Sequence, residues 1–191
     1  MLSKLIAATI MIILMPIFIF IGLVLLISDG FPILFKQKRI GRNNIEFTIY
    51  KFRTMKNHTP KNVATRFLKD PKKYNTIFGS ILREYSLDEL PQLINIIKGD
   101  MRFIGPRPCI STEKDLINLR KKYKTIQSNP GVTGWAQVNE RDSISIEDKA
   151  KMECFYMVNK SLLLDIKILL MTVKHVLLAS GIYPDKLKNI D

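Results

Sequence analysis

Cysteine and histidine are scarce in this chain of 191 residues, which has two of each. Cys109 and Cys154 do not form a Cys-x-x-Cys pair, so the sequence predicts neither a disulfide framework nor a zinc site. His58 and His175 each stand alone, which argues against a histidine metal site or a histidine-based catalytic triad. The chemistry of this protein is therefore expected to come from other side chains.

Acidic residues are also in short supply, because 17 Asp and Glu face 30 Lys and Arg, a formal net charge of +13. The excess is concentrated in residues 36–73, where twelve basic residues stand against Glu46 and Asp70, a net of 12 − 2 = +10. A surface of this charge predicts an anionic partner. Nucleic acid, anionic lipid headgroups and a nucleotide diphosphate all meet that description.

A long apolar run is present near the N-terminus, where residues 5–27 include no charged side chain. As a helix, this run would extend roughly 34 Å, enough to cross the hydrocarbon core of a bilayer. Pro16 lies in its middle and cannot donate a hydrogen bond to the carbonyl of Ile12, so we expect a bend or break there. We therefore assign residues 1–29 to a membrane-anchoring helix broken at Pro16, and residues 30–191 to one folded domain.

Two membrane topologies fit this segment. Hydropathy alone favours a kinked single pass, with the basic residues of 36–42 holding the rest of the chain in the cytoplasm. A re-entrant helix-break-helix would instead enter and leave the bilayer by the same face, and Lys4 would then extend back toward the headgroups.

Two acidic residues stand at the start of a predicted amphipathic helix. At about 100° per residue, Asp88, Gln92 and Asn95 share a polar face that we expect to point away from the core. The apolar residues of the opposite face are Leu87, Leu90, Leu93, Ile94 and Ile97. Ser86 and Glu89 have the spacing of a capping box, so both acids would lie in the first turn, where the helix dipole favours their ionised form. An ionised carboxylate can act as a nucleophile or as a metal ligand.

A conformationally restricted arginine follows this helix in the segment Gly105-Pro106-Arg107-Pro108. The prolines fix two backbone φ angles, which limits how far the guanidinium can move. A planar guanidinium suits bidentate phosphate binding. The same residues also fit a purely structural interpretation, a capped helix followed by a stiff turn.

Two further patterns complete the predicted fold. Residues 33–37 and 45–52 are predicted to form a β-hairpin around the turn-prone residues 41–44. Residues 162–178 form an amphipathic helix whose apolar arc spans roughly 140°. Its apolar residues are Leu162, Leu163, Ile166, Leu169, Leu170, Val173, Val176 and Leu177. Because Asp165 and two lysines flank the arc, a second span is disfavoured, and the helix either packs on the domain or lies in the headgroup plane.

Residues 86–108, SLDELPQLINIIKGDMRFIGPRP, resemble the signature of the bacterial sugar transferases, the monotopic phosphoglycosyl transferases that start glycan assembly on polyprenyl phosphate. Three further segments agree with that family in the same order: YKFRTM at 50–55, NPGVTGWAQ at 129–137 and SLLLDIK at 161–167. The resemblance implies an α+β, mostly helical enzyme with a re-entrant N-terminal segment and interfacial amphipathic helices. It also implies a place at the bacterial inner membrane, with the catalytic domain on the cytoplasmic face.

The resemblance further implies a mechanism and its partners. Asp88 would attack the sugar-bearing phosphate of a UDP-sugar, form an aspartyl-phosphosugar intermediate and release UMP, and polyprenyl phosphate would then take the sugar-1-phosphate. Asp88 and Glu89 would hold Mg²⁺, or Glu89 would manage the acceptor's proton. The residues expected to bind the phosphates and the nucleotide are Arg107, Arg83, Lys51, Arg53, Pro106, Pro108, Gln92 and Arg141. Anionic lipids are expected partners, and nucleic acid is not.

Two other functions stay open at this point. A membrane-tethered basic module would bind anionic lipid or nucleic acid without catalysis, although the basic run lacks a regular interleaving of aromatic residues. A lipid-linked glycosyltransferase of the inverting kind would release UDP, whereas a phosphoglycosyl transferase releases UMP. The identity of the released nucleotide separates these enzymes.

Overall fold

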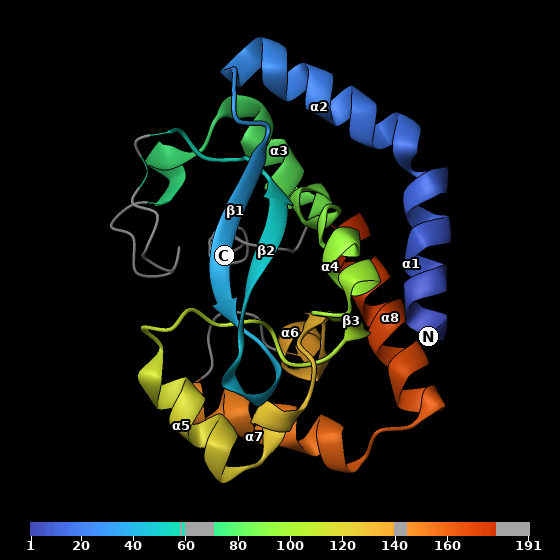
Figure 1. The fold of residues 1–191 in the computed structure, drawn as a ribbon, viewed down its shortest axis with the longest axis vertical. Helices are drawn as coiled ribbons and strands as arrows, with labels where there is room; N and C mark the ends of the chain where they lie inside the picture. The colour runs from blue at the N-terminus through green and yellow to red at the C-terminus, as the bar shows by residue number, and fades with distance from the viewer. Residues whose placement is uncertain (58, 60–70, 140–144, 179–191) are drawn as a thin grey trace, which may run out of the picture.

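The computed structural model describes residues 1–57, 59, 71–139 and 145–178 (Figure 1). These residues form mostly helices with two small two-stranded sheets, so the predicted α+β, mostly helical class is confirmed for the described ranges. The helices are α1 (Leu2–Ile13), α2 (Met15–Asp29), α3 (Ile77–Glu84), α4 (Gln92–Lys98), α5 (Lys114–Lys122), α6 (Trp135–Asn139), α7 (Ile146–Val158) and α8 (Leu162–Leu177). The strands are β1 (Leu34–Ile40), β2 (Glu46–Phe52), β3 (Arg102–Ile104) and β4 (Gly131–Thr133), and the short 3-10 helices are η1 (Arg42–Asn44), η3 (Pro71–Tyr74), η4 (Leu87–Glu89) and η5 (Thr125–Gln127).

The hairpin predicted from the sequence is confirmed. β1 and β2 pair in antiparallel fashion, with Leu34 opposite Phe52, and β1 extends beyond the predicted end to Ile40. Asn43 and Asn44 in the turn have positive φ angles of 54° and 63°. Asparagine tolerates this left-handed conformation better than most residues, which explains why the turn-prone segment closes the hairpin.

Four elements lie side by side across the molecule in the order β1, β2, α4 and α1 (Figure 1). One hydrophobic cluster joins the last three of them, and its buried residues are Ala7, Phe47, Ile49, Leu93, Ile96 and Met101. α2 continues over the end of the hairpin, where Ile21 and Leu25 are buried against Phe52 and Leu82. Both N-terminal helices are therefore packed along the domain.

The N-terminal apolar run forms two helices, because the chain bends by 61° between α1 and α2. The bend lies at Leu14, and Pro16 occupies the first turn of α2, where a missing N–H is best tolerated. Within the described residues, no single helix has the length and hydropathy needed to cross a bilayer, and α1 and α2 meet that requirement only when taken as a bent pair.

The capping box predicted at the two acids is wrong. Ser86 has a positive φ of 55° and its side chain makes no capping hydrogen bond. Asp88 and Glu89 lie in η4, and α4 begins three residues later at Gln92. The acids therefore precede α4 in a separate short turn, which places them at the junction of α3 and α4.

The predicted direction of the polar face is also wrong, because Asp88, Gln92 and Asn95 are 6%, 2% and 0% exposed. The reason is that α4 is covered on both sides. α1 packs on its apolar side, and the edge of β2 covers its polar side. Asn95 accepts a hydrogen bond from the Tyr50 N–H (3.1 Å) and donates one to the Thr48 carbonyl (2.7 Å). Its side-chain amide thus satisfies backbone groups at the edge of β2 that a neighbouring strand would otherwise bind.

α8 packs on the domain through a narrow strip. Ile168 is fully buried, and Leu164 and Met171 beside it contact the cluster around Tyr156. The Tyr156 hydroxyl also donates to Asp165 at 2.7 Å. The apolar arc predicted from the sequence faces outward, and its exposed members are Leu162, Leu163, Ile166, Leu169, Leu170, Val173 and Leu177.

Candidate active site

Glu89 is the centre of a compact ion-pair cluster beside β2. Its Oε1 lies 2.6 Å from the Lys51 Nζ and 3.0 Å from a guanidinium nitrogen of Arg107. Lys51 is on β2, Glu89 on η4 and Arg107 on the loop after β3. Three segments that are distant in the sequence, and that were all predicted to belong to the site, are thus brought together.

A cavity of about 530 Å³ runs along β1 and the end of β2. Part of its wall is apolar and consists of Pro32, Leu34, Phe35, Phe52 and Met55. The charged residues of the wall are Lys36, Arg39, Lys51, Arg53, Lys56, Arg83 and Asp88. Six basic groups against one acid give a formal charge of 6 − 1 = +5. Among the described residues that line the cavity, Asp88 is the one acid. A basic wall with an apolar side suits a ligand that has phosphates and a hydrocarbon part.

The two acids have opposite electrostatic environments. Burial raises the pKa of Asp88 to about 6, and the repulsion from Glu89 acts in the same direction while Lys51 opposes both. Burial would also raise the pKa of Glu89, but Arg107 and Lys51 together outweigh it and hold that pKa well below its usual range. Glu89 is therefore a fixed carboxylate. Asp88 is mostly ionised at neutral pH, and because its carboxylate is buried, this ionisation costs folding free energy.

Asp88 has an unsatisfied oxygen. Its Oδ1 is buried and accepts no hydrogen bond from any described residue. A buried carboxylate oxygen without a donor is uncommon and costs free energy, so its presence in a native site calls for an explanation. A cation or a phosphoryl group bound in the cavity would supply one.

The donor set also bears on the predicted Mg²⁺. Mg²⁺ is usually held by one or two carboxylates together with phosphate oxygens and water. Asp88 Oδ1 is free for this purpose, whereas Glu89 Oε1 already accepts from Lys51 and Arg107. In the described part of the chain there is no group of three or more His, Cys, Asp or Glu side chains that would hold a metal alone. The residues fit an ion that is shared with substrate phosphates.

Arg83 and Arg53 both line the cavity, but they are held differently. Arg83 is largely buried on α3 and donates to Asn75 Oδ1 at 3.1 Å. Arg53 uses one guanidinium nitrogen for the carbonyls of Asp29 (2.6 Å) and Gly30 (2.8 Å) at the end of α2. Arg53 therefore connects the N-terminal helices to the cavity wall.

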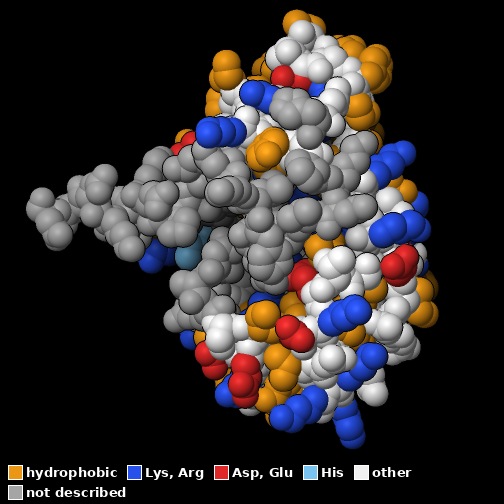
Figure 2. All heavy atoms as spheres, turned by 90° about the vertical axis from the view of Figure 1, so that its left-hand side faces the viewer, with side chains coloured by type: hydrophobic (Ala, Val, Ile, Leu, Met, Phe, Trp, Pro, Cys, Tyr) orange, Lys and Arg blue, Asp and Glu red, His pale blue; other side chains and the backbone are white. Residues whose placement is uncertain are grey.

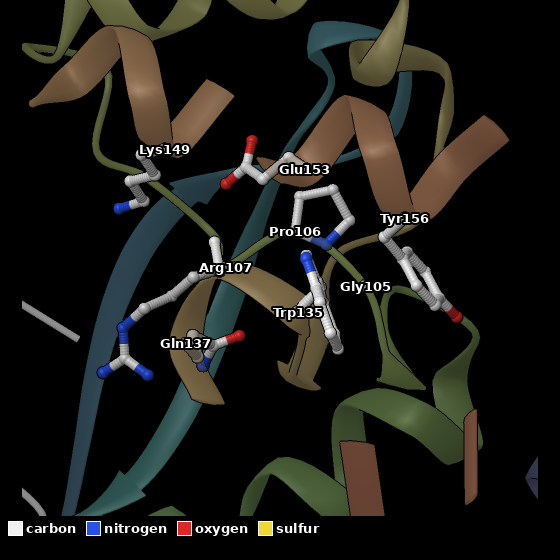
Figure 3. Close-up of a pocket in the computed structure, with 9 residues that line it drawn as sticks. Gly105, Pro106, Arg107, Trp135, Gln137, Lys149, Glu153 and Tyr156 are labelled. Atoms are coloured by element: carbon white, nitrogen blue, oxygen red, sulfur yellow. The ribbon is translucent and has the colours of Figure 1, made fainter. Parts of the chain in front are cut away.

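The loop that carries Arg107 is shaped by a close approach of two backbones. A Cβ atom added at Gly131 would lie 2.1 Å from the backbone nitrogen of Gly105, so only glycine fits there. The Gly131 N–H donates to the carbonyl of Pro106 at 2.9 Å. In Figure 3, Pro106 lies beside Trp135 around a small pocket, and the side chain of Arg107 extends away from it. The loop thus directs Arg107 toward Glu89.

A buried ion pair behind this loop was not predicted. Arg120 of α5 donates to both carboxylate oxygens of Glu153 on α7, at 2.7 Å and 2.5 Å. The same guanidinium donates to the carbonyl of Arg107 at 2.8 Å. The pair therefore fixes the backbone from which Arg107 extends. No local signal in the sequence could reveal it, because its members are 33 residues apart.

The remaining predicted residues have less direct positions. Pro106 and Pro108 hold the Arg107 loop, and the Pro108 carbonyl accepts a long hydrogen bond from Arg39 at 3.4 Å. Gln92 is buried in α4 and is not among the residues that line the cavity. Arg141 lies outside the described residues.

Comparison with known proteins agrees with this geometry. Residues 1–179 match the family model described as "Bacterial sugar transferase". The chain is 42% identical over 153 residues to the uncharacterized sugar transferase EpsL of Bacillus subtilis, covering 80% of this chain and 74% of the relative. It is 35% identical over 193 residues to the exopolysaccharide production protein ExoY of Sinorhizobium fredii, covering 94% and 85%.

Longer relatives carry more specific names. The UDP-glucose:undecaprenyl-phosphate glucose-1-phosphate transferase of Escherichia coli is 33% identical over 174 residues, which cover 87% of this chain and 37% of the relative. The UDP-N-acetylgalactosamine-undecaprenyl-phosphate N-acetylgalactosaminephosphotransferase of Aeromonas hydrophila is 36% identical over 164 residues, covering 83% and 38%. The similarity to these proteins therefore concerns one part of each.

Proposed function

The chain belongs to the bacterial sugar transferase family, and on that basis we propose that it transfers a sugar-1-phosphate from a UDP-sugar to a polyprenyl phosphate, with release of UMP. Three of the relatives are named as transferases that act on undecaprenyl phosphate, which supports this class of acceptor. The observation that carries the proposal is Asp88 Oδ1, an unsatisfied carboxylate oxygen in a basic cavity with an apolar side. The reaction needs a nucleophile of this kind, cations around it to bind the phosphates, and an apolar surface beside it to bind the hydrocarbon chain of the acceptor.

The first step is a displacement at the phosphorus atom that bears the sugar. A carboxylate oxygen of Asp88 bonds to this phosphorus, and the bond from phosphorus to the bridging oxygen breaks. The electron pair leaves on that oxygen, so UMP departs and the phosphosugar stays on Asp88 as an acyl phosphate. The raised pKa of Asp88 fits this role, because a carboxylate that is poorly stabilised by its surroundings is a better nucleophile.

The second step reverses the roles. A phosphate oxygen of the polyprenyl phosphate attacks the same phosphorus, a new diphosphate linkage forms, and Asp88 is regenerated as a carboxylate. No oxidation or net proton transfer is required. The apolar part of the cavity wall, with Leu34, Phe35 and Phe52, would accommodate the first isoprene units of the acceptor.

The neighbouring residues have electrostatic roles in this scheme. Arg83 and Lys51 lie close enough to lower the energy of the charged Asp88 and would also offset charge on the phosphoryl oxygens. Glu89 holds Lys51 and Arg107 at fixed positions. Asp88 would hold Mg²⁺ through its free Oδ1, and Glu89 through the oxygen that does not accept from Lys51 and Arg107; the bound ion would neutralise charge on the diphosphate.

The outer surface supports a place at the membrane. In Figure 2, hydrophobic side chains gather at the end of the molecule where α2 lies, whereas charged side chains cover the end formed by α5 and α7. The outward arc of α8 adds exposed leucines such as Leu163 and Leu170. Because α1 and α2 both pack on the domain, they favour a re-entrant anchor at the cytoplasmic face of the inner membrane over a helix that leaves the domain to cross it.

The proposal is tested with purified full-length protein in vesicles containing undecaprenyl phosphate and Mg²⁺. We expect a panel of UDP-sugars to include one that yields UMP and a lipid-linked phosphosugar. The same donor without acceptor is expected to leave a phosphosugar on Asp88, detected as a mass increase on the protein. Release of UDP, or transfer without any trapped intermediate in repeated single-turnover experiments, would contradict the two-step route.

A further inference from the structure

Arg39 on β1 lines the cavity but was not singled out by any sequence pattern. One terminal nitrogen donates to Gln37 Oε1 at 2.6 Å and the other to the Pro108 carbonyl at 3.4 Å. The Nε of Arg39 is buried and has no acceptor among the described residues. All hydrogen-bond partners of this guanidinium in the described chain are thus neutral.

The charge of Arg39 is therefore poorly compensated. A half-buried guanidinium is commonly paired with a carboxylate, yet none of the ion pairs in the described residues includes Arg39. Two carboxylates, Glu113 and more weakly Glu89, act on Arg39 electrostatically, but neither forms an ion pair with it. Glu113 accepts from the Ile110 N–H, and Glu89 is already bound by Lys51 and Arg107. Burial and the repulsion from Arg107 lower the pKa of Arg39 to about 10, so it remains a cation at neutral pH. An anion in the cavity would supply the missing countercharge.

The position of Arg39 indicates which part of the donor this anion is. Glu89 and Arg107 act electrostatically on both Asp88 and Arg39. Asp88 is additionally influenced by Lys51 and Arg83, whereas Arg39 adjoins the Arg107 loop through the Pro108 carbonyl. Asp88 and Arg39 both line the same cavity, Asp88 from η4 and Arg39 from β1. A diphosphate with one phosphorus at Asp88 would have its second phosphate in that cavity, on the side of the β1 cation.

We propose that Arg39, oriented by Gln37, binds the phosphate that stays with the nucleotide, in the donor and in the UMP product. This assignment rests on the proposed function and adds a binding residue to it. Arg39 would hold the leaving group while Asp88 takes the phosphosugar. Gln37 is a positioning residue, because it contacts the guanidinium and acts through it.

The test compares binding of two probes, UMP and uridine, to full-length protein in detergent or vesicles. We expect Arg39→Gln to weaken UMP binding by roughly 10- to 100-fold, because a charge-assisted bidentate contact to phosphate is lost. Uridine, which has no phosphate, is expected to bind as it does to the wild type. In steady-state assays the donor KM should rise and the acceptor KM should stay unchanged.

Two further variants make the test specific. Arg42→Gln removes an exposed arginine from the turn of the same hairpin and serves as the matched control, with UMP binding expected to be unchanged. Arg39→Lys keeps the charge but loses the planar guanidinium. We therefore expect its affinity for UMP to lie between that of the wild type and that of Arg39→Gln. Arg39→Lys also keeps the test valid if Arg39→Gln fails to fold, which thermal unfolding would reveal.

The proposal is overturned if folded Arg39 variants bind UMP with wild-type affinity, or if they lose UMP and uridine affinity equally. The second result would mean that Arg39 only shapes the site. Failure of the proposed function gives a different result, since wild-type protein would then release no UMP from any UDP-sugar. The two failures are therefore distinguishable in the same set of measurements.

Discussion

α4 and α8 are both amphipathic, but each departs from the usual relation between polarity and burial. The polar side of α4 is buried, with Gln92 and Asn95 almost inaccessible to solvent, whereas the apolar arc of α8 is exposed, with Leu163 at 79%. The difference follows from their neighbours. α4 is enclosed by α1 on one side and β2 on the other, and α8 is held to the domain by a strip around Ile168.

The comparison shows where the burial of side chains in this protein differs from that in a typical water-soluble globular protein. A buried polar face is stable only when its groups are satisfied, and the exception here, Asp88 Oδ1, lies in the proposed site. An exposed apolar face of this extent is typical of a surface that another apolar phase covers. The buried polar side of α4 and the exposed apolar arc of α8 therefore correspond to the two proposed tasks, chemistry and membrane contact.

The largest effect is expected at the acid that precedes α4. Asp88→Asn should lower transfer by about 1000-fold or more, because the nucleophile is removed while its shape is kept. The same change should raise the thermal stability of the metal-free protein at pH 7. The pKa of Asp88 in the folded protein, about 6, lies above the ordinary value of 3.8 for an aspartate, so ionised Asp88 destabilises the fold. Stability is therefore lost as the pH rises through that interval.

Activity assays and thermal unfolding in the presence of a chelator check both effects. Wild-type stability should fall between pH 4 and pH 6 more steeply than that of Asp88→Asn. Transfer by the variant at near-wild-type rates would remove Asp88 as the nucleophile, whatever its effect on stability.

The next largest effect is expected at the buried amide of α4. Asn95→Leu leaves the Tyr50 N–H and the Thr48 carbonyl without their partner, and should destabilise the protein by about 2–4 kcal/mol. Urea-induced unfolding measures this change. Asn159→Ala, an exposed amide at the end of α7, is the control and should stay within about 0.5 kcal/mol of the wild type. Equal effects would mean that the polar side of α4 is not enclosed as described.

The smallest effect on stability is expected at the outward arc of α8, where Leu170→Ser should change the unfolding free energy by about 0.5 kcal/mol or less. Ile168→Ala, on the inward strip of the same helix, should cost about 2–4 kcal/mol. Binding to anionic vesicles should weaken for Leu170→Ser and stay unchanged for Ile168→Ala. Vesicle flotation and chemical unfolding together separate the two faces, and the opposite pattern would place the membrane elsewhere.

The sequence predicted much of the fold and the residues that gather around Glu89. The β-hairpin and the helices at α4 and α8 follow from local patterns of polarity and turn residues. The direction of the polar side of α4 could not be predicted, because helical periodicity identifies two unlike faces but does not say that β2 will cover the polar one. Periodicity likewise left the α8 arc undecided between core and membrane.

Long-range polar contacts were beyond local reasoning. Arg120 belongs to a charged helix and has the sequence context of a solvated residue, yet it pairs with Glu153 in the interior. Arg39 is one of several basic residues of β1, and only its burial and its neutral partners distinguish it. The family motif identified Arg107, while the residues that hold it in place became visible only in three dimensions.

The contact of Arg53 with the end of α2 has a mechanical consequence. Because one guanidinium joins the carbonyls at the end of α2 to the cavity wall, a shift or tilt of α2 relative to the domain would move that wall with it. If α2 sits in one leaflet as proposed, a thicker or thinner leaflet would change the height of the cavity relative to the lipid phosphates, and with it the access of a lipid-linked acceptor.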